Sequence, residues 1–391
     1  MTRTLWRAGA LAEDAAERAD REGASSARRL VSARRAGLAA LALAGLVVAG
    51  CGSGDKGSGG GSTAASTSQH DRKIVVGYSD PVGSNQAQQA VYRAQKEAAK
   101  QLGWEIVHLD ANLSPSKQLS DIDSMISRKV DAINSWTLEE GAADAAYRRA
   151  VEAGIVIVGQ STASPYMSST VWLQQNYGCS LAKMGAKYIA DRRPGAKTLV
   201  IGGPPVKAIT HYAQCFLDAA KAAGLTVLDK KDNMADTAAG SQPIAAAMVN
   251  QHPDVEAVWT YNDPTALGAG NALKAAGKQV WQEGKSDDGV IVIGSNGTEE
   301  GIQGIKSGLM TVTYDMHPDV IGTQIIAVLA KHFRDGVPAK DLPKNVVVPT
   351  TKWDLSNVAD YVDPMKRPIK LGAVLGTGEN SAGQGDHEIT R

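Results

Sequence analysis

Short apolar runs alternate with segments of helical periodicity along most of this chain, and this alternation is what most constrains its fold. Runs of consecutive apolar residues, many of them β-branched, are typical of strands buried on both faces of a parallel sheet. Between the runs, apolar residues recur at spacings of three and four, as in Ala87, Val91, Ala94 and Ala98, which predicts amphipathic helices. We predict strands at residues 74–76, 104–109, 130–133, 155–158, 198–201, 225–228, 255–260, 290–293 and 310–313.

Strand–helix repeats of this kind predict parallel sheets joined by right-handed crossovers. The number of repeats exceeds what one hydrophobic core accommodates, and residues 51–391 suffice for two domains of ordinary size. We therefore predict an α/β fold with two doubly wound parallel-sheet lobes. In such sheets ligands bind beyond the carboxyl ends of the strands, and clefts between domains are favoured pockets.

The first part of the chain is organised like an export signal. Four arginines between residues 28 and 35 precede an apolar stretch at 37–48, which is too short to span a bilayer comfortably. The small residues just before Cys51 resemble a bacterial lipobox, in which the cysteine thiol is lipidated and becomes the mature N-terminus. We expect residues 1–50 to be a signal peptide and residues 51–71, rich in Gly and Ser, to be a flexible tether. The protein would then work outside the cytoplasmic membrane, anchored to its outer face by lipid. An ordinary signal peptide and a short membrane anchor are the alternatives.

Composition and motifs exclude several classes of function. The formal net charge is zero and no long basic run follows residue 50, so we expect no nucleic-acid partner. No C-x-x-C or H-E-x-x-H spacing occurs, so we predict no metal and no other cofactor. Residues 159–163 depart from the G-x-S-x-G nucleophile motif at their last position. Cys179 and Cys215 either form a disulfide or remain two buried thiols.

Polar side chains follow many of the predicted strands, and most of them are neutral. Amides both donate and accept hydrogen bonds, as sugar hydroxyls do, and aromatic rings stack on the apolar face of a sugar. No arginine, the usual partner of carboxylates and phosphates, follows any of these strands. We therefore predict a binding site for a neutral solute, formed by Tyr78, Ser84, Asn85, Trp136, Gln160, Ser161, Asn262, Asn296, Asp315 and His317.

Several of these positions also have a purely structural explanation. Residues 262–264, Asn-Asp-Pro, form a typical helix N-terminus. Asn296 precedes a glycine, as in many turns, Trp136 is equally consistent with core packing, and His317 with an ordinary loop. The recurrence of polar residues after successive strands, rather than any single residue, supports the site.

Several segments together resemble the ribose/galactose-type solute-binding proteins of ABC importers. Residues 262–268, Asn-Asp-Pro-Thr-Ala-Leu-Gly, match the family pattern Asn-Asp-x-x-Ala-x-Gly at the start of a helix. Residues 292–298, Val-Ile-Gly-Ser-Asn-Gly-Thr, are similar to the family's Val-x-Gly-Phe-Asp-Gly-Thr. Residues 311–322 resemble the last crossover with its helix, and residues 176–189 resemble the start of the second lobe. The resemblance covers about residues 72–360, and the combination is specific although no single segment is.

This resemblance implies the type I periplasmic-binding-protein fold, in which two lobes close like a jaw around the solute. It implies three crossovers between the lobes, near Gln175, at residues 295–298 and at residues 315–318. It implies an N-terminal lobe at residues 72–175 and 318–345 and a C-terminal lobe at 176–317 and 346–365. We expect a polar tail at residues 366–391.

The ligand positions of the family carry over unevenly. Asn262 matches directly, whereas Asn296 replaces an aspartate. Residues 160–161, Gln-Ser, stand where pentose binders often have Asp-Arg, and Tyr212 stands where an arginine is common. The charged contacts to pyranose hydroxyls are therefore largely missing.

The last ligand position lies in residues 313–317, where either Asp315 or His317 takes the place of the family's glutamine. The resemblance implies a binding protein without catalytic activity. It would capture a small neutral solute, a sugar or a polyol, and deliver it to the membrane permease of an ABC importer, and we expect a monomer. The alternatives are a sensory receptor that signals to a membrane kinase and an extracellular carbohydrate-acting enzyme.

Overall fold

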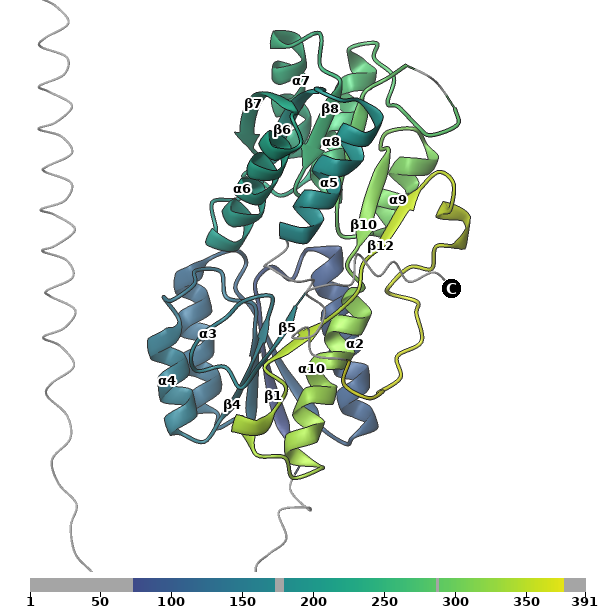
Figure 1. Ribbon diagram of the computed structural model, residues 1–391. Coiled ribbons are helices and arrows are strands. Elements are labelled where there is room, and N and C mark those ends of the chain that lie inside the picture. Colours follow the sequence, from purple (N-terminus) through teal and green to yellow (C-terminus); the bar gives the residue numbers. More distant parts are fainter. Residues whose placement is uncertain (1–72, 173–178, 286–287, 376–391) are drawn as a thin grey trace, which may run out of the picture. The chain divides into compact units, whose positions relative to one another are not determined.

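Two α/β lobes, each built on its own sheet, make up the described part of the chain (Figure 1). The structure is a computed structural model, and it describes residues 73–172, 179–285 and 288–375. All of these residues belong to one compact unit of the chain. The predicted fold class is confirmed.

The first lobe has its sheet between two pairs of helices. Helices α2 (Gln86–Gln101) and α10 (Pro318–Phe333) cover one face, and α3 (Pro115–Ser127) and α4 (Asp144–Glu152) cover the other (Figure 1). The strands are β1 (Val75–Asp80), β2 (Glu105–Asp110), β3 (Ala132–Ser135), β4 (Val156–Gln160), β5 (Ser169–Trp172) and β11 (Asn345–Val347). They pair in parallel in the order β11-β5-β4-β3-β1-β2.

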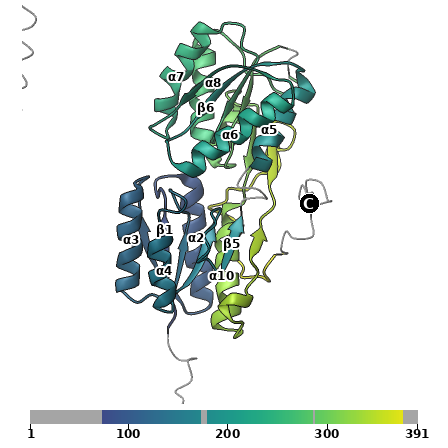
Figure 2. The same cartoon turned by 60° about the vertical axis from the view of Figure 1, so that its left-hand side comes forward.

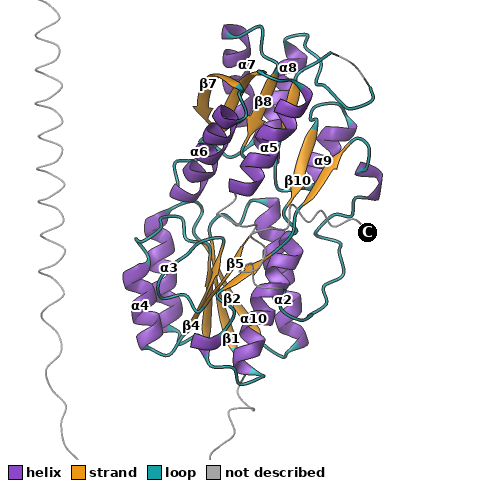
Figure 3. Cartoon of the chain, in the orientation of Figure 1, coloured by secondary structure: helices purple, strands orange, loops and turns teal. Residues whose placement is uncertain are grey.

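The second lobe repeats this arrangement (Figure 3). Helices α5 (Cys179–Arg192) and α6 (Lys207–Ala222) cover one face, and the other is covered by α7 (Ala238–Gln251), α8 (Asp263–Ala275) and α9 (Glu299–Lys306). The strands are β6 (Lys197–Gly202), β7 (Thr226–Asp232), β8 (Ala257–Thr260), β9 (Ile291–Ile293), β10 (Val312–Asp315) and β12 (Thr351–Asp354). Their order is β12-β10-β9-β8-β6-β7, with β12 antiparallel to β10 and the other pairs parallel.

The central strands of both sheets are buried on both faces, which explains the continuous apolar runs in the sequence. Successive side chains of a strand point to opposite faces. In β6, Val200 accordingly packs with α5 and α6, whereas Leu199 and Ile201 pack with the helices on the other face. A strand covered on one side would instead alternate apolar and polar residues.

Side-chain caps define where many of the helices begin. The side chains of Asn85, Ser114, Thr237, Asn262 and Thr298 each accept a hydrogen bond from a first-turn N–H, at the starts of α2, α3, α7, α8 and α9. Such a cap satisfies a backbone donor that the helix itself leaves without a partner. None of the helices in the described residues is long and apolar enough to cross a membrane. Cys51 lies outside the described residues.

The chain crosses between the two sheets three times in the order of its elements. The first passage, from β5 to α5, runs through residues 173–178, which contain Gln175 and lie outside the described residues. The second leads from β10 to α10, and the third from β11 to β12. The crossover predicted at residues 295–298 is wrong, because these residues join β9 to α9 within the second lobe and Thr298 caps α9.

The C-terminal part of the chain also differs from the prediction. β11 belongs to the first sheet, so this lobe extends to Val347, past the predicted limit at residue 345. Residues 366–375 are not a separate tail, because Ile369, Leu371 and Val374 pack on the core that α2 and α10 share. Residues 376–391 lie outside the described residues.

Arg367 ties this C-terminal segment to the crossover between β10 and α10. Its guanidinium donates to Asp319 Oδ1 at 2.9 Å and to the carboxylate of Asp315, and it lies 3.1 Å from His317 Nδ1. Trp353 in β12 donates to the same Asp315 carboxylate at 3.2 Å. The Arg367 side chain is 13% exposed and the Asp315 side chain fully buried, so the cluster is largely shielded from solvent.

Replacing Arg367 by alanine should destabilise the fold strongly. The change leaves two buried carboxylates without their cation, for which a loss of about 3–5 kcal/mol in the free energy of unfolding is typical. Urea unfolding measures this, with Lys366→Ala as control, since the Lys366 side chain is 74% exposed and pairs with Asp363 at the surface. The control should change stability by less than about 0.5 kcal/mol. Equal losses in the two variants would contradict the buried cluster.

Asp263, the first residue of α8, joins the start of this helix to the cap of α9 and to β10. Its Oδ2 accepts hydrogen bonds of 2.9 Å from both the backbone N–H and the hydroxyl of Thr298, and its Oδ1 accepts one from the Thr313 hydroxyl. Two glycines make room for it: a Cβ at Gly294 or Gly301 would fall 2.5 Å from a carboxylate oxygen. Burial raises the pKa of Asp263 from 3.8 to about 7, and the three donors oppose this shift.

The pKa of Asp263 predicts a specific pH dependence of stability. Between about pH 4 and about pH 7 the folded protein keeps a proton that the unfolded chain has lost, so stability falls as pH rises through this window and levels off above it. Asp263→Asn removes the titration. The stability of the wild type relative to the variant should therefore fall by up to about 1.4 kcal/mol per pH unit. Urea unfolding at about pH 5 and about pH 7.5 measures it, and a difference that does not change with pH would refute the raised pKa.

Candidate functional site

A cavity of about 100 Å³ lies at the carboxyl ends of the strands of both lobes. From the first lobe it is lined by residues that follow β1 to β4 and by the first turns of α2 and α10; the second lobe contributes the starts of α5 and α6 and the segments after β7, β8 and β9. Several of these helices can be located in Figure 2. The polar and aromatic lining residues are Asn85, Gln88, Trp136, Gln160, Ser161, Tyr212, Asp236, Tyr261, Asn262, Ser295 and Asn296.

The first-lobe wall carries two polar atoms with no partner among the described residues. Gln160 Nε2 donates to Gln88 Oε1 at 3.1 Å, and the same oxygen accepts from the Tyr78 hydroxyl at 2.8 Å. Gln160 Oε1 and Trp136 Nε1 are buried and make no hydrogen bond to any described residue. A buried polar atom without a partner is costly, so one acceptor and one donor here are available to a ligand.

Buried Gln118 of α3 positions the loop that carries Trp136. Gln118 Nε2 donates to the carbonyl oxygen of Trp136 at 2.8 Å, and Gln118 Oε1 accepts from the Leu138 N–H at 2.9 Å. The indole is therefore held from behind by its backbone, and Trp136 lines the cavity instead of filling the core of the sheet.

Asn262 has both of the roles that its sequence allowed. Its Oδ1 accepts from the Thr265 N–H at 3.0 Å and caps α8, and its Nδ2 donates to Asp236 Oδ1 at 2.6 Å in the cavity wall. Capping fixes the orientation of the amide, so that the N–H₂ group faces Asp236. The structural and binding explanations of this residue therefore do not exclude each other.

Asp236 is the single carboxylate among the residues that line the cavity. Besides Asn262, the Tyr261 hydroxyl donates to it, and the Asn85 side chain of the first lobe lies near enough to lower its pKa. Burial raises the pKa of Asp236, and these hydrogen bonds oppose the shift. Burial and the nearby Asp236 charge raise the pKa of Tyr261, so its hydroxyl stays protonated and acts as the donor.

Tyr212 and Asn296 complete the second-lobe wall. The Tyr212 hydroxyl lies 3.2 Å from Ser295 Oγ, and its ring meets Trp259 edge-on with centroids 5.1 Å apart. Burial raises the pKa of Tyr212, which keeps this hydroxyl neutral. Asn296 has a positive φ of 111° and is 9% exposed, and its N–H donates to the Tyr314 carbonyl at 3.0 Å.

Four residues proposed from the sequence lie outside the lining of this cavity. Tyr78 is fully buried behind Gln88, and Ser84 is exposed at the surface. Asp315 and His317 belong to the Arg367 cluster at the crossover, where His317 Nε2 also lies 2.9 Å from the Thr351 hydroxyl. These two side chains are thus engaged in holding the crossover.

The site predicted from the sequence lacks four polar residues that line the cavity, namely Gln88, Asp236, Tyr261 and Ser295. Tyr261 directly follows β8 and Ser295 closely follows β9, so the rule that selected Asn262 and Asn296 applies to both, whereas Asp236 lies four residues past the end of β7. Gln88 lies inside the first turn of α2, and its sequence context carries no comparable signal. The apolar lining, which includes Val82, Leu113 and Met316, has none either, because such residues are indistinguishable from core.

Comparison with known proteins places this chain in one family. Residues 76–336 match the periplasmic binding protein domain. The ribose import binding protein of Bacillus subtilis is 26% identical over 260 residues, covering 66% of this chain and 81% of that protein. The corresponding Salmonella typhimurium protein is 30% identical over 243 residues, covering 61% and 77%.

A solved structure agrees with this result. The crystal structure of the Caulobacter myo-inositol binding protein bound to myo-inositol superposes with a TM-score of 0.63 at 20% identity, covering 74% of this chain and 95% of that one. At this identity the likeness concerns the fold. Together with the family match over two thirds of the chain, it shows that this protein belongs to the periplasmic binding protein domain family.

Proposed function

We propose that this protein is the extracytoplasmic solute-binding component of a sugar ABC importer, and that it binds one small neutral sugar or polyol in the cavity between its lobes. The observation that carries the proposal is the lining itself. Neutral amides, hydroxyls and aromatic rings surround the cavity together with a single carboxylate, and no Arg or Lys is among them. The ribose import binding proteins that match along most of the chain support the sugar class.

The volume of the cavity suits one monosaccharide. A water-sized group needs about 10–15 Å³ in the same measure, so about 100 Å³ holds roughly seven to ten such groups. That is comparable with the ring and hydroxyls of a pentose or hexose and too small for an oligosaccharide. Val82, Leu113, Leu181, Ile209 and Met316 offer apolar surface to the C–H groups of such a molecule.

The electrostatics of the cavity favour a neutral ligand. The first turns of α2, α6 and α10 contribute lining residues, and helix N-termini carry partial positive charge that suits the lone pairs of hydroxyl oxygens. Asp236 opposes an anionic ligand by like-charge repulsion and desolvation. The arrangement therefore supports binding of a molecule with oxygen atoms but no net charge.

The two other functions considered receive no support. A glycoside hydrolase uses a pair of carboxyl groups that flank the bond to be cleaved. Asp80 bonds to His108, Asp263 to the two threonines and Asp315 to Arg367, which leaves Asp236 alone in the cavity lining. The matched relatives are import binding proteins, which favours transport over signalling to a kinase and over catalysis.

Lipid attachment and the permease complete the proposal. The sequence before Cys51 supports a lipidated N-terminus, and residues 51–71 would let the folded part stand away from the membrane. Closure of the two lobes about the crossovers would present a surface formed by both lobes to a membrane permease. A monomer is sufficient for this, since the cavity is lined by residues of one chain.

A thermal-shift screen should identify the solute class. A ligand that binds only the folded protein stabilises it by about 2.7 kcal/mol at one hundred times its dissociation constant. We expect at least one of D-ribose, myo-inositol or a linear polyol such as xylitol to raise the melting temperature by several degrees. A shift with phosphate, a sugar acid or an amino acid in place of every neutral sugar and polyol would overturn the neutral-ligand proposal.

Replacing Asn262 by alanine should weaken binding of the solute from that screen by at least tenfold, because the variant lacks the amide that faces the cavity. It also lacks the cap of α8, which costs about 1 kcal/mol of stability. Thr237→Ala is the matched control, because Thr237 caps α7 in the same lobe and is absent from the cavity lining. Isothermal titration calorimetry compares the two, and unchanged affinity in Asn262→Ala would refute the site.

A further inference from the structure

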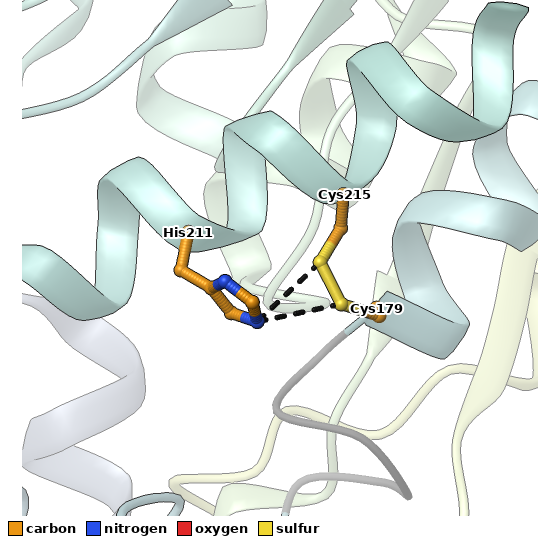
Figure 4. Close-up of side chains that lie close together, drawn as sticks. All are labelled: Cys179, His211 and Cys215. Atoms are coloured by element: carbon orange, nitrogen blue, oxygen red, sulfur yellow. Dashed lines mark hydrogen bonds between the residues drawn. A yellow bond between two sulfur atoms is a disulfide. The ribbon is translucent and has the colours of Figure 1, made fainter.

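A second group of side chains with ligating chemistry lies on the second lobe, outside the residues that line the cavity. Cys179 is the first residue of α5, and His211 and Cys215 lie one helical turn apart on α6 (Figure 4). The two cysteines form a disulfide with Cα atoms 5.1 Å apart. His211 Nε2 points at both sulfurs, at 3.5 Å from Cys179 Sγ and 3.6 Å from Cys215 Sγ (Figure 4).

These two distances match the separation between two ligand atoms in a tetrahedral zinc site. With Zn–S bonds of about 2.3 Å and Zn–N bonds of about 2.0–2.1 Å, tetrahedral angles place nitrogen and sulfur about 3.5 Å apart. The imidazole nitrogen is therefore already placed relative to each sulfur as a metal would require. The two sulfur atoms of such a site lie about 3.8 Å apart. Sulfurs joined in a disulfide cannot reach this separation, but two thiols that rotate independently about their Cα–Cβ bonds can.

We infer that the dithiol form of this protein binds one thiophilic divalent ion such as Zn²⁺ through Cys179, Cys215 and His211, and that the disulfide and the metal site are mutually exclusive. Two protein thiolates and one imidazole are a known ligand combination for zinc. His211 is exposed, so a water molecule has access to the fourth coordination position. The inference does not depend on the proposed function, because none of the three residues lines the cavity.

The positions of the three residues on their helices favour metal binding. Cys179 lies at the N-terminus of α5, where the helix dipole stabilises a thiolate. His211 and Cys215, four residues apart on one helix, share a face and need no rearrangement of the backbone to bind the same ion.

The dithiol and disulfide forms of the protein interconvert by gain and loss of two electrons and two protons. The newly made chain carries both thiols, and binding of Zn²⁺ releases their two protons. Thiol–disulfide exchange with a disulfide oxidant takes two electrons and two protons from the thiols, forms the S–S bond and releases the oxidant as its dithiol. A dithiol reductant returns them by thiol–disulfide exchange and leaves as its own disulfide.

The test uses the full chain with Cys51→Ser, so that Cys179 and Cys215 are the two remaining cysteines. The protein is reduced with a phosphine, freed of reductant without oxygen, and titrated with Co²⁺, whose thiolate complexes absorb by charge transfer. We expect one Co²⁺ per chain in the reduced protein, displacement by Zn²⁺, and a melting temperature that Zn²⁺ raises. The oxidised protein should show none of these effects.

Two histidine variants distinguish metal binding at the three-residue site from adventitious metal binding to the thiols alone. His211→Ala should weaken Co²⁺ binding at least tenfold. His252→Ala, which changes a histidine at the end of α7, should leave it unchanged. The proposal is overturned if the reduced protein gives no charge-transfer band, if His211→Ala binds Co²⁺ as tightly as the parent, or if Zn²⁺ fails to raise the melting temperature of the reduced protein.

Discussion

The buried carboxylate of Asp263 fixes the relative positions of the loops on which the second-lobe wall of the cavity depends. It fastens the start of α8 to the cap of α9 and to β10, and Asn262 immediately before it caps α8. A rigid network of this kind places the amide of Asn262 and the segment around Asn296 without any contact to a ligand. The binding residues of this lobe are thus held in place by side chains that lie behind them.

The layout of the lobes was predictable because burial on both faces of a sheet leaves a strong sequence pattern. The strands β5, β11 and β12 were not predicted, and each has only three or four residues. Length is not the reason, because β3 and β9 are as short and were predicted; these three segments become strands because β4, β5 and β10 offer edges to pair with. Such pairing is a property of the assembled sheet, so local sequence does not reveal it.

The same distinction applies to the cavity. Most of the polar lining could be predicted from the residues that follow the strands, because the carboxyl ends of parallel strands share one edge of the sheet. It failed for Asp315 and His317, whose partner Arg367 comes about fifty residues later in the sequence. Nothing near Asp315 distinguishes a carboxylate that binds a ligand from one neutralised by a distant arginine. Resemblance to a family adds little here, since the cavity differs from the family pattern at its charged positions.

Asn85 of the first lobe and Asp236 of the second interact through their side chains in the cavity wall. A contact of this kind changes the fraction of molecules in which both walls of the cavity face each other. The apparent dissociation constant equals the intrinsic one divided by that fraction. Strengthening or weakening this contact would therefore multiply the affinities for all solutes by a common factor. The ratios of affinity between one solute and another would still be set by the other lining residues. Affinity and selectivity are in this way adjustable at separate positions of the same cavity.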